Sequence, residues 1–405
     1  MTPASAASHW GPLADRYENP QPQRRLLALD GGGIRGMLTL ELLSEMEAQL
    51  RARLGKDDTF RLADYFDYIA GTSTGAIIAA GLSVGMSVQE LIDFYRAEGK
   101  NMFDKAFLAN FGKNLYNDRP LARKLQEVFG QGTSIDLRSG KFKTMLLVVT
   151  MNRSTDSPWP ISNNPLAIYN HADRRDCNLN IRLYQLVRAS TAAPAYFQPE
   201  TLQWDPNNPE KTFVFVDGGM TPYNNPAFLL YRMATQPAYR LNWPTGEDKL
   251  LLVSVGTGSS PSAGAYGNLI NTLKELPNNL LYAMQVDQDI NCRTVGRCSY
   301  GAPIDREMED LIPYRVRLGH QTREREEIPL SENLGKQFLY VRYNVDLSQE
   351  SLTKLGLPHI ESEKVREMDA VDQLDALQEV GKAGARQISL AHFGSFVPPV
   401  AVPAL

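Results

Sequence analysis

The stretch LLALDGGGIRGMLTLELL, residues 26–43, places Gly31, Gly33 and Gly36 between a short apolar run and a segment with apolar residues at helical spacing. This order predicts a strand, a glycine loop and a helix in succession. The same spacing is the dinucleotide-binding fingerprint, in which backbone N–H groups approach a pyrophosphate. Its physical basis is more general, because unblocked N–H groups at a helix start favour any anion, including the oxyanion of an acyl-transfer intermediate. The loop alone leaves both interpretations open.

Length and composition restrict the class of protein. The 405 residues are 43% hydrophobic, which allows a large buried core in one α/β domain or two smaller ones. The formal net charge of −4 gives no basic field that would attract a nucleic acid, and we expect no nucleic-acid partner. The N-terminal stretch MTPASAASHWGPLADRYENP lacks the features of a secretory signal, and no apolar run approaches the roughly 18 residues that span a membrane. We therefore expect a cytoplasmic protein.

The cysteines give no indication of a bound metal. Cys177, Cys292 and Cys298 are odd in number and lack the spacing of a zinc site. We expect reduced thiols, no metal and no cofactor.

Residues 24–258 carry the apolar, β-rich runs and are expected to form the core. The runs are RRLLALD from Arg24, the start of FDYIAGTSTGAIIAAGLSVG (66–85), KTMLLVVT (143–150), TFVFVDGG (212–219) and KLLLVSVGTG (249–258). Strands that are apolar on both faces and alternate with helical segments predict a mostly parallel sheet covered by helices, with functional sites where strands end. Ser87 and Glu90 predict a capping box at the start of one helix.

Three further segments flank or extend this core. Residues 1–23 are polar and contain prolines, and they predict a loose N-terminal arm. Residues 259–345 are mixed in charge and weakly periodic, and they predict an elaboration of the sheet or a lid. Residues 346–405 predict a C-terminal helical segment that packs on the core. Its apolar residues at helical spacing are Val365, Met368, Val371, Leu374, Leu377 and Val380.

The motif GTSTG, residues 71–75, matches the Gly-x-Ser-x-Gly pattern of a nucleophile elbow. Gly71 and Gly75 would let the backbone turn sharply between a strand and a helix, so that the Ser73 hydroxyl projects above the sheet edge. A glycine–serine turn that merely joins a strand to a helix is the alternative. The upstream glycine loop favours the elbow, because acyl transfer needs oxyanion donors close to the nucleophile. Gly31, Gly32 and Gly33 would supply backbone N–H groups, and Arg35 a nearby cation.

Ser73 also needs a base, and Asp217 is the best candidate. It ends the run TFVFV and precedes Gly218 and Gly219, so its carboxylate would lie at the same strand-end edge as Ser73. An ordinary aspartate, with a pKa of about 3.9, is a weak base, but burial would raise that value. A histidine triad remains formally available, and an aspartate that only caps a turn is a further alternative. Of the five histidines, His320, His359 and His392 follow Asp217 and fit the chain order Ser–Asp–His, whereas the other two do not: His9 lies in the predicted arm and His171 in a polar loop.

The dinucleotide interpretation is weaker. It requires an acidic residue about 20 positions beyond the glycines, at a strand end. Asp57 and Asp58 have that spacing but lie in a polar loop, and this interpretation leaves Ser73 without a function.

Taken together, DGGGIRG (30–36), GTSTG (71–75) and DGG (217–219) resemble the motifs of the patatin-like phospholipases, as do STAAPAYF (190–197) and VSVGTG (253–258). The resemblance covers roughly residues 24–258. It implies a three-layer α/β/α sandwich and a Ser–Asp dyad that hydrolyses acyl esters of membrane lipids without a metal. Ser73 would be the nucleophile and Asp217 the base. The oxyanion hole would be Gly31, Gly32, Gly33, Arg35 and Gly36, with Gly71 and Gly75 at the elbow and Gly218 and Gly219 in a supporting turn.

The sequence therefore predicts a phospholipase A-type acyl hydrolase with transient, peripheral membrane contact. An acyltransferase, an idle scaffold, a histidine-triad esterase and a dinucleotide-binding oxidoreductase are the alternatives. An activator and a homo-oligomer remain open. A helix with Phe103, Phe107, Phe111 and Leu115 every four residues, interrupted by Lys105 and Lys113, predicts either an interfacial face or ordinary core packing.

Overall fold

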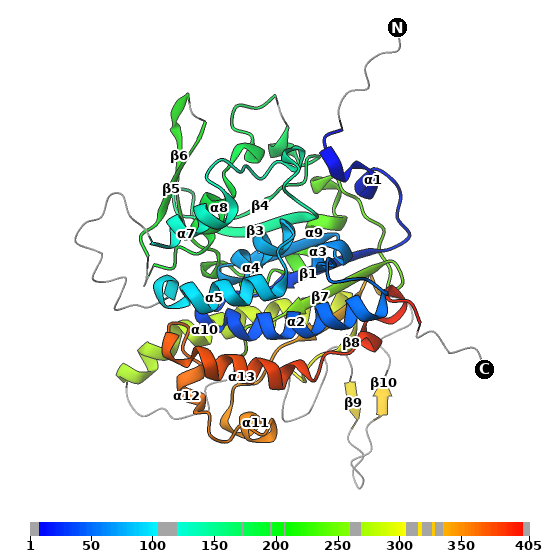
Figure 1. Cartoon of the computed structure of the whole chain (residues 1–405), viewed down its shortest axis with the longest axis vertical. Helices are drawn as coiled ribbons and strands as arrows, with labels where there is room; N and C mark the ends of the chain where they lie inside the picture. Colours follow the sequence, from blue (N-terminus) through cyan, green and yellow to red (C-terminus); the bar gives the residue numbers. More distant parts are fainter. Residues whose placement is uncertain are drawn as a thin grey trace.

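Nine strands form one mixed sheet in the computed structural model, and helices cover both of its faces (Figure 1). The structure describes residues 8–103, 120–171, 173–194, 197–205, 207–259, 269–304, 315–317, 326–328 and 335–399. The strand order is β5-β6-β3-β2-β1-β7-β11-β8, and β4 pairs with β3. The neighbours from β3 through β2, β1, β7 and β11 to β8 are parallel, whereas β4, β5 and β6 add antiparallel pairs.

The strands of this sheet have the following bounds: β1 Arg24–Leu29, β2 Tyr68–Thr72, β3 Met145–Asn152, β4 Ser157–Ser162, β5 Glu200–Asp205, β6 Asn208–Asp217, β7 Leu250–Val255, β8 Arg297–Tyr300 and β11 Leu339–Tyr343. A separate antiparallel pair is formed by β9 (Arg315–Arg317) and β10 (Glu326–Ile328).

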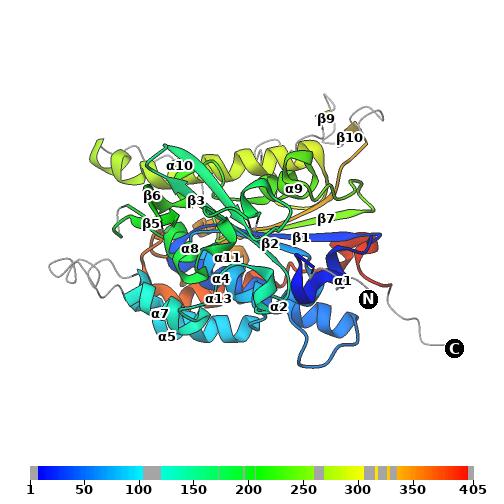
Figure 2. The same ribbon diagram turned by 90° about the horizontal axis from the view of Figure 1, so that it is seen from above.

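The described helices have the following bounds: α1 Ala14–Tyr17, α2 Gly36–Arg53, α3 Leu62–Tyr65, α4 Thr74–Ser83, α5 Val88–Phe103, α7 Pro120–Phe129, α8 Leu183–Ser190, α9 Ala227–Thr235, α10 Leu269–Val295, α11 Gln349–Lys354, α12 Ser362–Val365 and α13 Leu374–Ala385. Figure 2 shows α9 and α10 on one face of the sheet and α2, α4, α5 and α13 on the other.

The predicted α/β/α architecture is confirmed. Every residue of β2 and β7 is buried, which is why these strands appear in the sequence as continuous apolar runs. All ten residues of α4 are buried as well, so the small residues of GTSTGAIIAAG let this helix pack closely on the sheet. The capping box is also confirmed: the Ser87 N–H donates to Glu90 Oε2 at 2.7 Å, and the Glu90 N–H donates to Ser87 Oγ at 3.1 Å.

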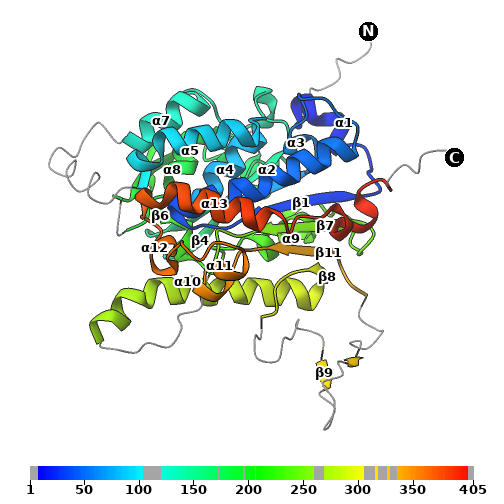
Figure 3. The same cartoon turned by 60° about the horizontal axis from the view of Figure 1, so that its bottom comes forward.

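The C-terminal segment packs against α2, as Figure 3 shows for α13. Gln378 Nε2 donates to Glu41 Oε1 at 2.6 Å, and Leu377 and Val380 are fully buried. The apolar period predicted from Val365 to Val380 is divided between α12 and α13, with a connecting loop at residues 366–370. This loop reaches the glycine loop after β1 and becomes important at the site.

Two segments outside residues 24–258 contribute to the core. Residues 8–23 are not a loose arm, because Trp10 and Tyr17 are buried and Arg16 Nη1 donates to the carbonyl of Ala63 at 2.7 Å. The sheet also does not end at residue 258. β8 and β11 come from the segment for which the sequence predicts an elaboration of the sheet or a lid, and β11 pairs with β7 in parallel. These strands have four and five residues, and the sequence around them is mixed in charge and weakly periodic, so no strand was predicted there.

The predicted interfacial helix is described only in part. Phe103 is buried, and its ring centroid lies 6.0 Å from that of Tyr95. This residue therefore packs in the core. Phe107, Phe111 and Leu115, with Lys105 and Lys113, lie outside the described residues.

Candidate active site

Ser73 lies at a sharp turn between β2 and α4. Its backbone has φ +54° and ψ −124°, a combination that is rare for a residue with a side chain and is found at nucleophile elbows. The turn is tight because a Cβ at Gly75 would lie 2.3 Å from the carbonyl oxygen of Leu29 in β1. A Cβ at Gly71 would likewise lie 2.1 Å from the carbonyl oxygen of Gly75. Both glycines are therefore required by close backbone approach.

The register of β3 brings Asp217 to Ser73. On one edge of β3, Val149 pairs with Thr72 of β2, and the next residue, Thr150, pairs with Asp217 of β6. The end of β2 and the end of β6 therefore meet at adjacent positions. Ser73 follows Thr72 directly, and its Oγ donates to Asp217 Oδ2 at 2.5 Å.

Burial changes the chemistry of the Asp217 carboxyl group. Asp217 is 6% exposed, and desolvation raises its pKa to about 6. The Ser73 hydroxyl, the Gly219 N–H and the charge of Arg188 act in the opposite direction and limit the rise. The Gly219 N–H donates to Asp217 Oδ1 at 2.7 Å, which fixes the carboxylate with Oδ2 toward Ser73. Gly218 is also close-packed, since a Cβ there would lie 2.2 Å from the carbonyl oxygen of Val149.

Ser190 supports the elbow from α8 and was not predicted as a site residue. Its Oγ accepts a hydrogen bond from the Ser73 N–H at 2.9 Å and donates to the carbonyl of Val149 at 2.6 Å. Ser190 is the first residue of STAAPAYF, so the sequence did contain a signal for it. The role of its hydroxyl depends on a contact across more than a hundred residues, which the motif does not reveal.

The glycine loop lies against Ser73, and its N–H groups differ in whether a protein acceptor already takes them. A Cβ at Gly31 would lie 3.2 Å from the Cβ of Ser73. The Gly31 N–H donates to the carbonyl of Asn224 at 3.0 Å, so the prediction of Gly31 as a donor is corrected. Within the described residues, the N–H groups of Gly32 and Gly33 donate to no protein atom.

The other two predicted members of the oxyanion hole have different positions. Arg35 is buried, and its guanidinium donates to the carbonyl oxygens of Gly32 at 3.4 Å and Arg366 at 3.2 Å, so it braces the loop. The Gly36 N–H is directed to the carbonyl of Gly33 inside the helical turn. Gly36 instead allows close packing, because a Cβ there would lie 2.6 Å from Thr74 Oγ1.

Comparison with known proteins identifies the family of this chain. The family model described as patatin-like phospholipase matches residues 27–231. The chain belongs to the patatin-like phospholipase family. It is 33% identical over 231 residues to a cGAMP-activated phospholipase of Vibrio cholerae, covering 54% of this chain and 59% of that protein. It is 30% identical over 248 residues to Patatin-17 of Solanum cardiophyllum, covering 58% of this chain and 60% of that protein.

The chain spans about three-fifths of the length of these curated relatives. Among solved structures, human GIVD cytosolic phospholipase A2 matches with a TM-score of 0.47 and 10% identity, covering 95% of this chain and 62% of that one.

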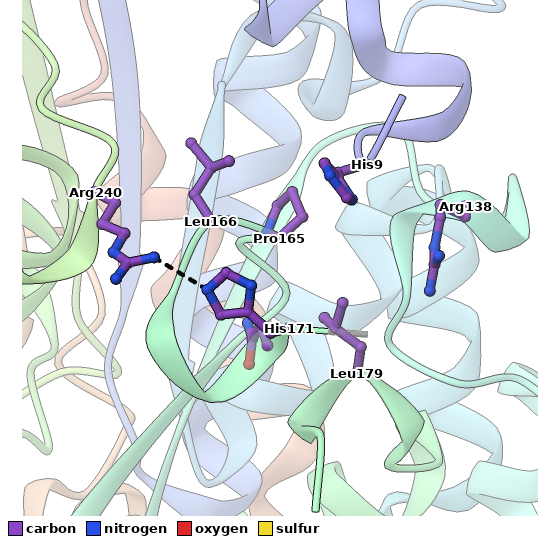
Figure 4. Close-up of a pocket in the computed structure, with 8 residues that line it drawn as sticks. His9, Arg138, Pro165, Leu166, His171, Leu179 and Arg240 are labelled. Carbon is purple, nitrogen blue, oxygen red and sulfur yellow. Dashed lines mark hydrogen bonds between the residues drawn. The ribbon is translucent and has the colours of Figure 1, made fainter. Parts of the chain in front are cut away.

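The histidines of this patatin-like chain contact other groups. Arg240 Nη1 donates to His171 Nε2 at 3.0 Å, and both residues line a cavity that also includes His9 and contains neither Ser73 nor Asp217 (Figure 4). His359 pairs with Glu379 at 3.2 Å, and His392 Nδ1 lies 2.8 Å from the Tyr343 hydroxyl. His320 lies outside the described residues. Among the histidines that the structure describes, none provides a partner for Ser73.

The dinucleotide interpretation does not fit the patatin-like site. Asp57 and Asp58 lie beyond the end of α2, whose 18 residues separate them from the glycine loop by about 27 Å. Asp58 pairs with Arg51 there, and Asp57 accepts a hydrogen bond from Thr59. In the described ranges, no group of three or more His, Cys, Asp or Glu side chains has the arrangement of a metal site, and no helix is long and apolar enough to cross a membrane.

Proposed function

We propose that this protein is a lipid acyl hydrolase that cleaves fatty-acyl esters of phospholipids, with Ser73 as nucleophile and Asp217 as base. The observation that carries the proposal is the 2.5 Å hydrogen bond from Ser73 Oγ to a buried carboxylate. The N–H groups of Gly32 and Gly33 in the adjacent loop, which donate to no protein atom in the described part of the chain, add to it. A nucleophile, a base and oxyanion donors are the three parts that acyl transfer requires.

In the first half of the reaction, Ser73 Oγ attacks the ester carbonyl carbon while Asp217 Oδ2 accepts the hydroxyl proton. The N–H groups of Gly32 and Gly33 would stabilise the negative charge on the tetrahedral intermediate. The intermediate collapses as the C–O bond to the alcohol breaks, and the leaving lysolipid oxygen takes the proton from Asp217. The acyl group remains on Ser73.

In the second half, Asp217 accepts a proton from a water molecule that attacks the acyl-serine carbonyl. The bond to Ser73 Oγ breaks, the proton returns to Oγ, and the fatty acid leaves. The same geometry admits another alcohol in place of water. In that case the product is a new ester, and the protein acts as an acyltransferase.

Apolar side chains at the rim of the site support an apolar substrate. Met220 is 58% exposed and directly follows the Asp217–Gly219 turn. A Cβ at Gly219 would lie 3.7 Å from Leu281 of α10, and the neighbouring Leu280 is 51% exposed. Exposed apolar residues beside a site favour contact with a lipid surface. We propose that the protein acts in the cytoplasm and contacts membranes peripherally.

The test is fatty-acid release from mixed phospholipid vesicles. Wild type, Ser73→Ala, Asp217→Ala and a variant without histidines are compared, each shown to be folded by circular dichroism. Ser87→Ala serves as the control, because Ser87 caps α5 and does not contact the dyad. Assays are run with and without cGAMP, since that is the activator named for the Vibrio cholerae relative.

We expect both dyad variants to lose at least about a thousandfold in rate, and the control and the histidine-free variant to remain active. A folded Ser73→Ala protein that releases fatty acid at the wild-type rate would overturn the proposal. Loss of activity in the histidine-free protein as well as in Ser73→Ala would instead indicate a histidine triad. Added glycerol that diverts the acyl group into a new ester would indicate a transferase.

A further inference from the structure

Arg342, from β11, reaches the glycine loop although it lies outside the residues matched by the family model. β7 lies between β11 and β1, and Arg342 pairs in register with Ser254, which pairs with Ala28. The guanidinium extends past Ser254 to Asp30, the residue that precedes Gly31. Nη1 donates to Asp30 Oδ1 at 2.9 Å and Nη2 to Oδ2 at 2.6 Å, and Nη1 also donates to Ser254 Oγ at 2.7 Å.

This ion pair is removed from solvent. The Asp30 side chain is 0% exposed and the Arg342 side chain 5% exposed. Burial raises the pKa of the Asp30 carboxyl group, and Arg342 is the main group that opposes the rise. A bidentate guanidinium–carboxylate pair fixes the orientation of the carboxylate as well as its distance from the guanidinium. The direction of the Asp30 side chain is therefore set by β11.

The backbone on either side of Asp30 is also fixed. The Asp30 N–H donates to the carbonyl of Val255 at 3.1 Å, and Thr257 Oγ1 donates to the carbonyl of Gly31 at 3.0 Å. On the far side, the Ile34 N–H donates to the carbonyl of Met368 at 2.9 Å. Between these anchors lie Gly32 and Gly33, whose N–H groups are the candidate oxyanion donors.

We propose that Arg342 is a positioning residue, which holds Asp30 so that the Gly32 and Gly33 N–H groups point at the developing oxyanion. This inference rests on the proposed acyl hydrolase function. It assigns a role to the segment after residue 258, which the sequence motifs did not cover. Displacing a catalytic group by about 1 Å can reduce a rate by about a hundredfold, so a loosened loop is expected to reduce the rate of chemistry.

The chain offers a matched control at the opposite end of β1. Arg16 Nε donates to Asp67 Oδ1 at 3.1 Å, and Asp67 Oδ2 accepts the N–H of Arg25 at 2.9 Å. This is also an arginine–aspartate pair that holds β1, but it lies at the amino end of the strand and does not contact the glycine loop. Arg16→Met therefore reports the cost of losing a structural ion pair.

The experiment measures kcat and KM for a small ester together with the rate at which an alkyl fluorophosphonate modifies Ser73. In that reaction Ser73 Oγ forms a bond to phosphorus, its proton passes to Asp217, and the P–F bond breaks as fluoride leaves. Wild type, Arg342→Met, Arg342→Lys, the double variant Asp30→Asn/Arg342→Met and Arg16→Met are compared, with thermal unfolding for each. Ser73→Ala shows that the modification is specific.

We expect Arg342→Met to lower kcat and the modification rate about 30-fold, with KM within about threefold of wild type. Arg342→Lys should recover part of the loss, and Arg16→Met should keep kcat within about twofold. The double variant removes the unpaired carboxylate, so its thermal stability should return toward wild type while kcat stays low.

Recovery of kcat together with stability in the double variant would overturn the positioning role, as would a folded Arg342→Met protein with wild-type kcat. If Arg342→Met does not fold, the double variant and Arg342→Lys decide the question by the same criteria. If wild type itself neither cleaves esters nor reacts at Ser73, the proposed function fails. That result differs from failure of the positioning role, in which wild type reacts at Ser73 and the folded Arg342→Met protein reacts equally fast.

Discussion

The carboxyl group of Asp217 is buried beside the hydroxyl group of Ser73, and its pKa is raised to about 6. An aspartate with an ordinary pKa would be a poor proton acceptor at neutral pH. Desolvation makes it a better base but also disfavours its ionised form. At the residue scale, the same burial that assists the proposed chemistry therefore costs stability, and both effects can be measured through pH.

The rate of ester hydrolysis should depend on ionised Asp217. We expect kcat/KM to fall about tenfold per pH unit as the pH decreases below about 6, because protonated Asp217 cannot accept the Ser73 proton. The measurement is a pH–rate profile from pH 4.5 to 9 with a small soluble ester. The histidine-free variant is expected to show the same fall in kcat/KM at low pH. If that fall disappears when the histidines are removed, the assignment to Asp217 is contradicted.

The free energy of unfolding should change with pH in the opposite direction to the rate. Because the pKa of Asp217 is raised in the folded state, its ionisation destabilises the fold as the pH rises from about 4 to about 6, and the full cost persists above that range. We expect Asp217→Asn to raise the free energy of unfolding at pH 8 by up to about 3 kcal/mol, with no such gain at pH 4. Urea unfolding at both pH values measures this. An equal gain at both would show that ionisation is not the cause.

At the scale of elements, the site exists because three strand ends meet at one edge. β1 delivers the glycine loop, β2 delivers Ser73, and β6 delivers Asp217. The last two meet because Val149 and Thr150 are adjacent on β3 and pair with Thr72 and Asp217. α4 must then pack close to β1, and Gly75 is the point of contact.

Replacing Gly75 tests how closely α4 must approach. Gly75→Ala places a Cβ 2.3 Å from the carbonyl oxygen of Leu29 and 2.6 Å from that of Asp30, backbone atoms that cannot rotate away. We expect a loss of about 2–4 kcal/mol in the free energy of unfolding and a loss of activity, because α4 and Ser73 must shift.

Gly132→Ala is the matched control for this substitution. A Cβ at Gly132 meets nothing within 4 Å. We expect its stability and activity to stay near those of wild type. Wild-type activity in a folded Gly75→Ala protein would show that the elbow tolerates the shift.

At the scale of the whole molecule, residues that are distant in sequence complete the sheet. β11 pairs with β7 and provides Arg342 for Asp30, while the loop between α12 and α13 covers the glycine loop at Met368. The glycine loop of the candidate site therefore depends on the last third of the chain. The core cannot be separated at residue 258 without exposing the edge of β7 and leaving Asp30 unpaired.

A truncation tests this dependence. We expect a fragment of residues 24–258 to be unfolded or aggregated, because an isolated buried carboxylate and an exposed apolar strand edge are both strongly unfavourable. A fragment of residues 8–399 should fold with a single thermal transition. Circular dichroism and thermal unfolding distinguish the two. A folded 24–258 fragment would show that β11 is dispensable.

Local patterns in the sequence determined the class of fold and the candidate dyad. Continuous apolar runs mark strands that are buried on both faces, and glycine spacing marks points where backbones must approach closely. Both are properties of neighbouring residues, so β1, β2, β7 and the elbow at Ser73 were predicted from sequence alone. The place of Asp217 at the end of a strand-like run made it the candidate base, and the resemblance to the family motifs implied the same pairing.

Only the tertiary structure decided which N–H groups are available, which residues support the elbow, and where the core ends. The N–H of Gly31 is taken by Asn224, Ser190 holds the backbone of Ser73, and Arg342 holds Asp30. Each of these contacts joins residues more than a hundred positions apart. Their partners are set by strand order and register, which arise from packing of the whole sheet and leave no periodic signal along the chain.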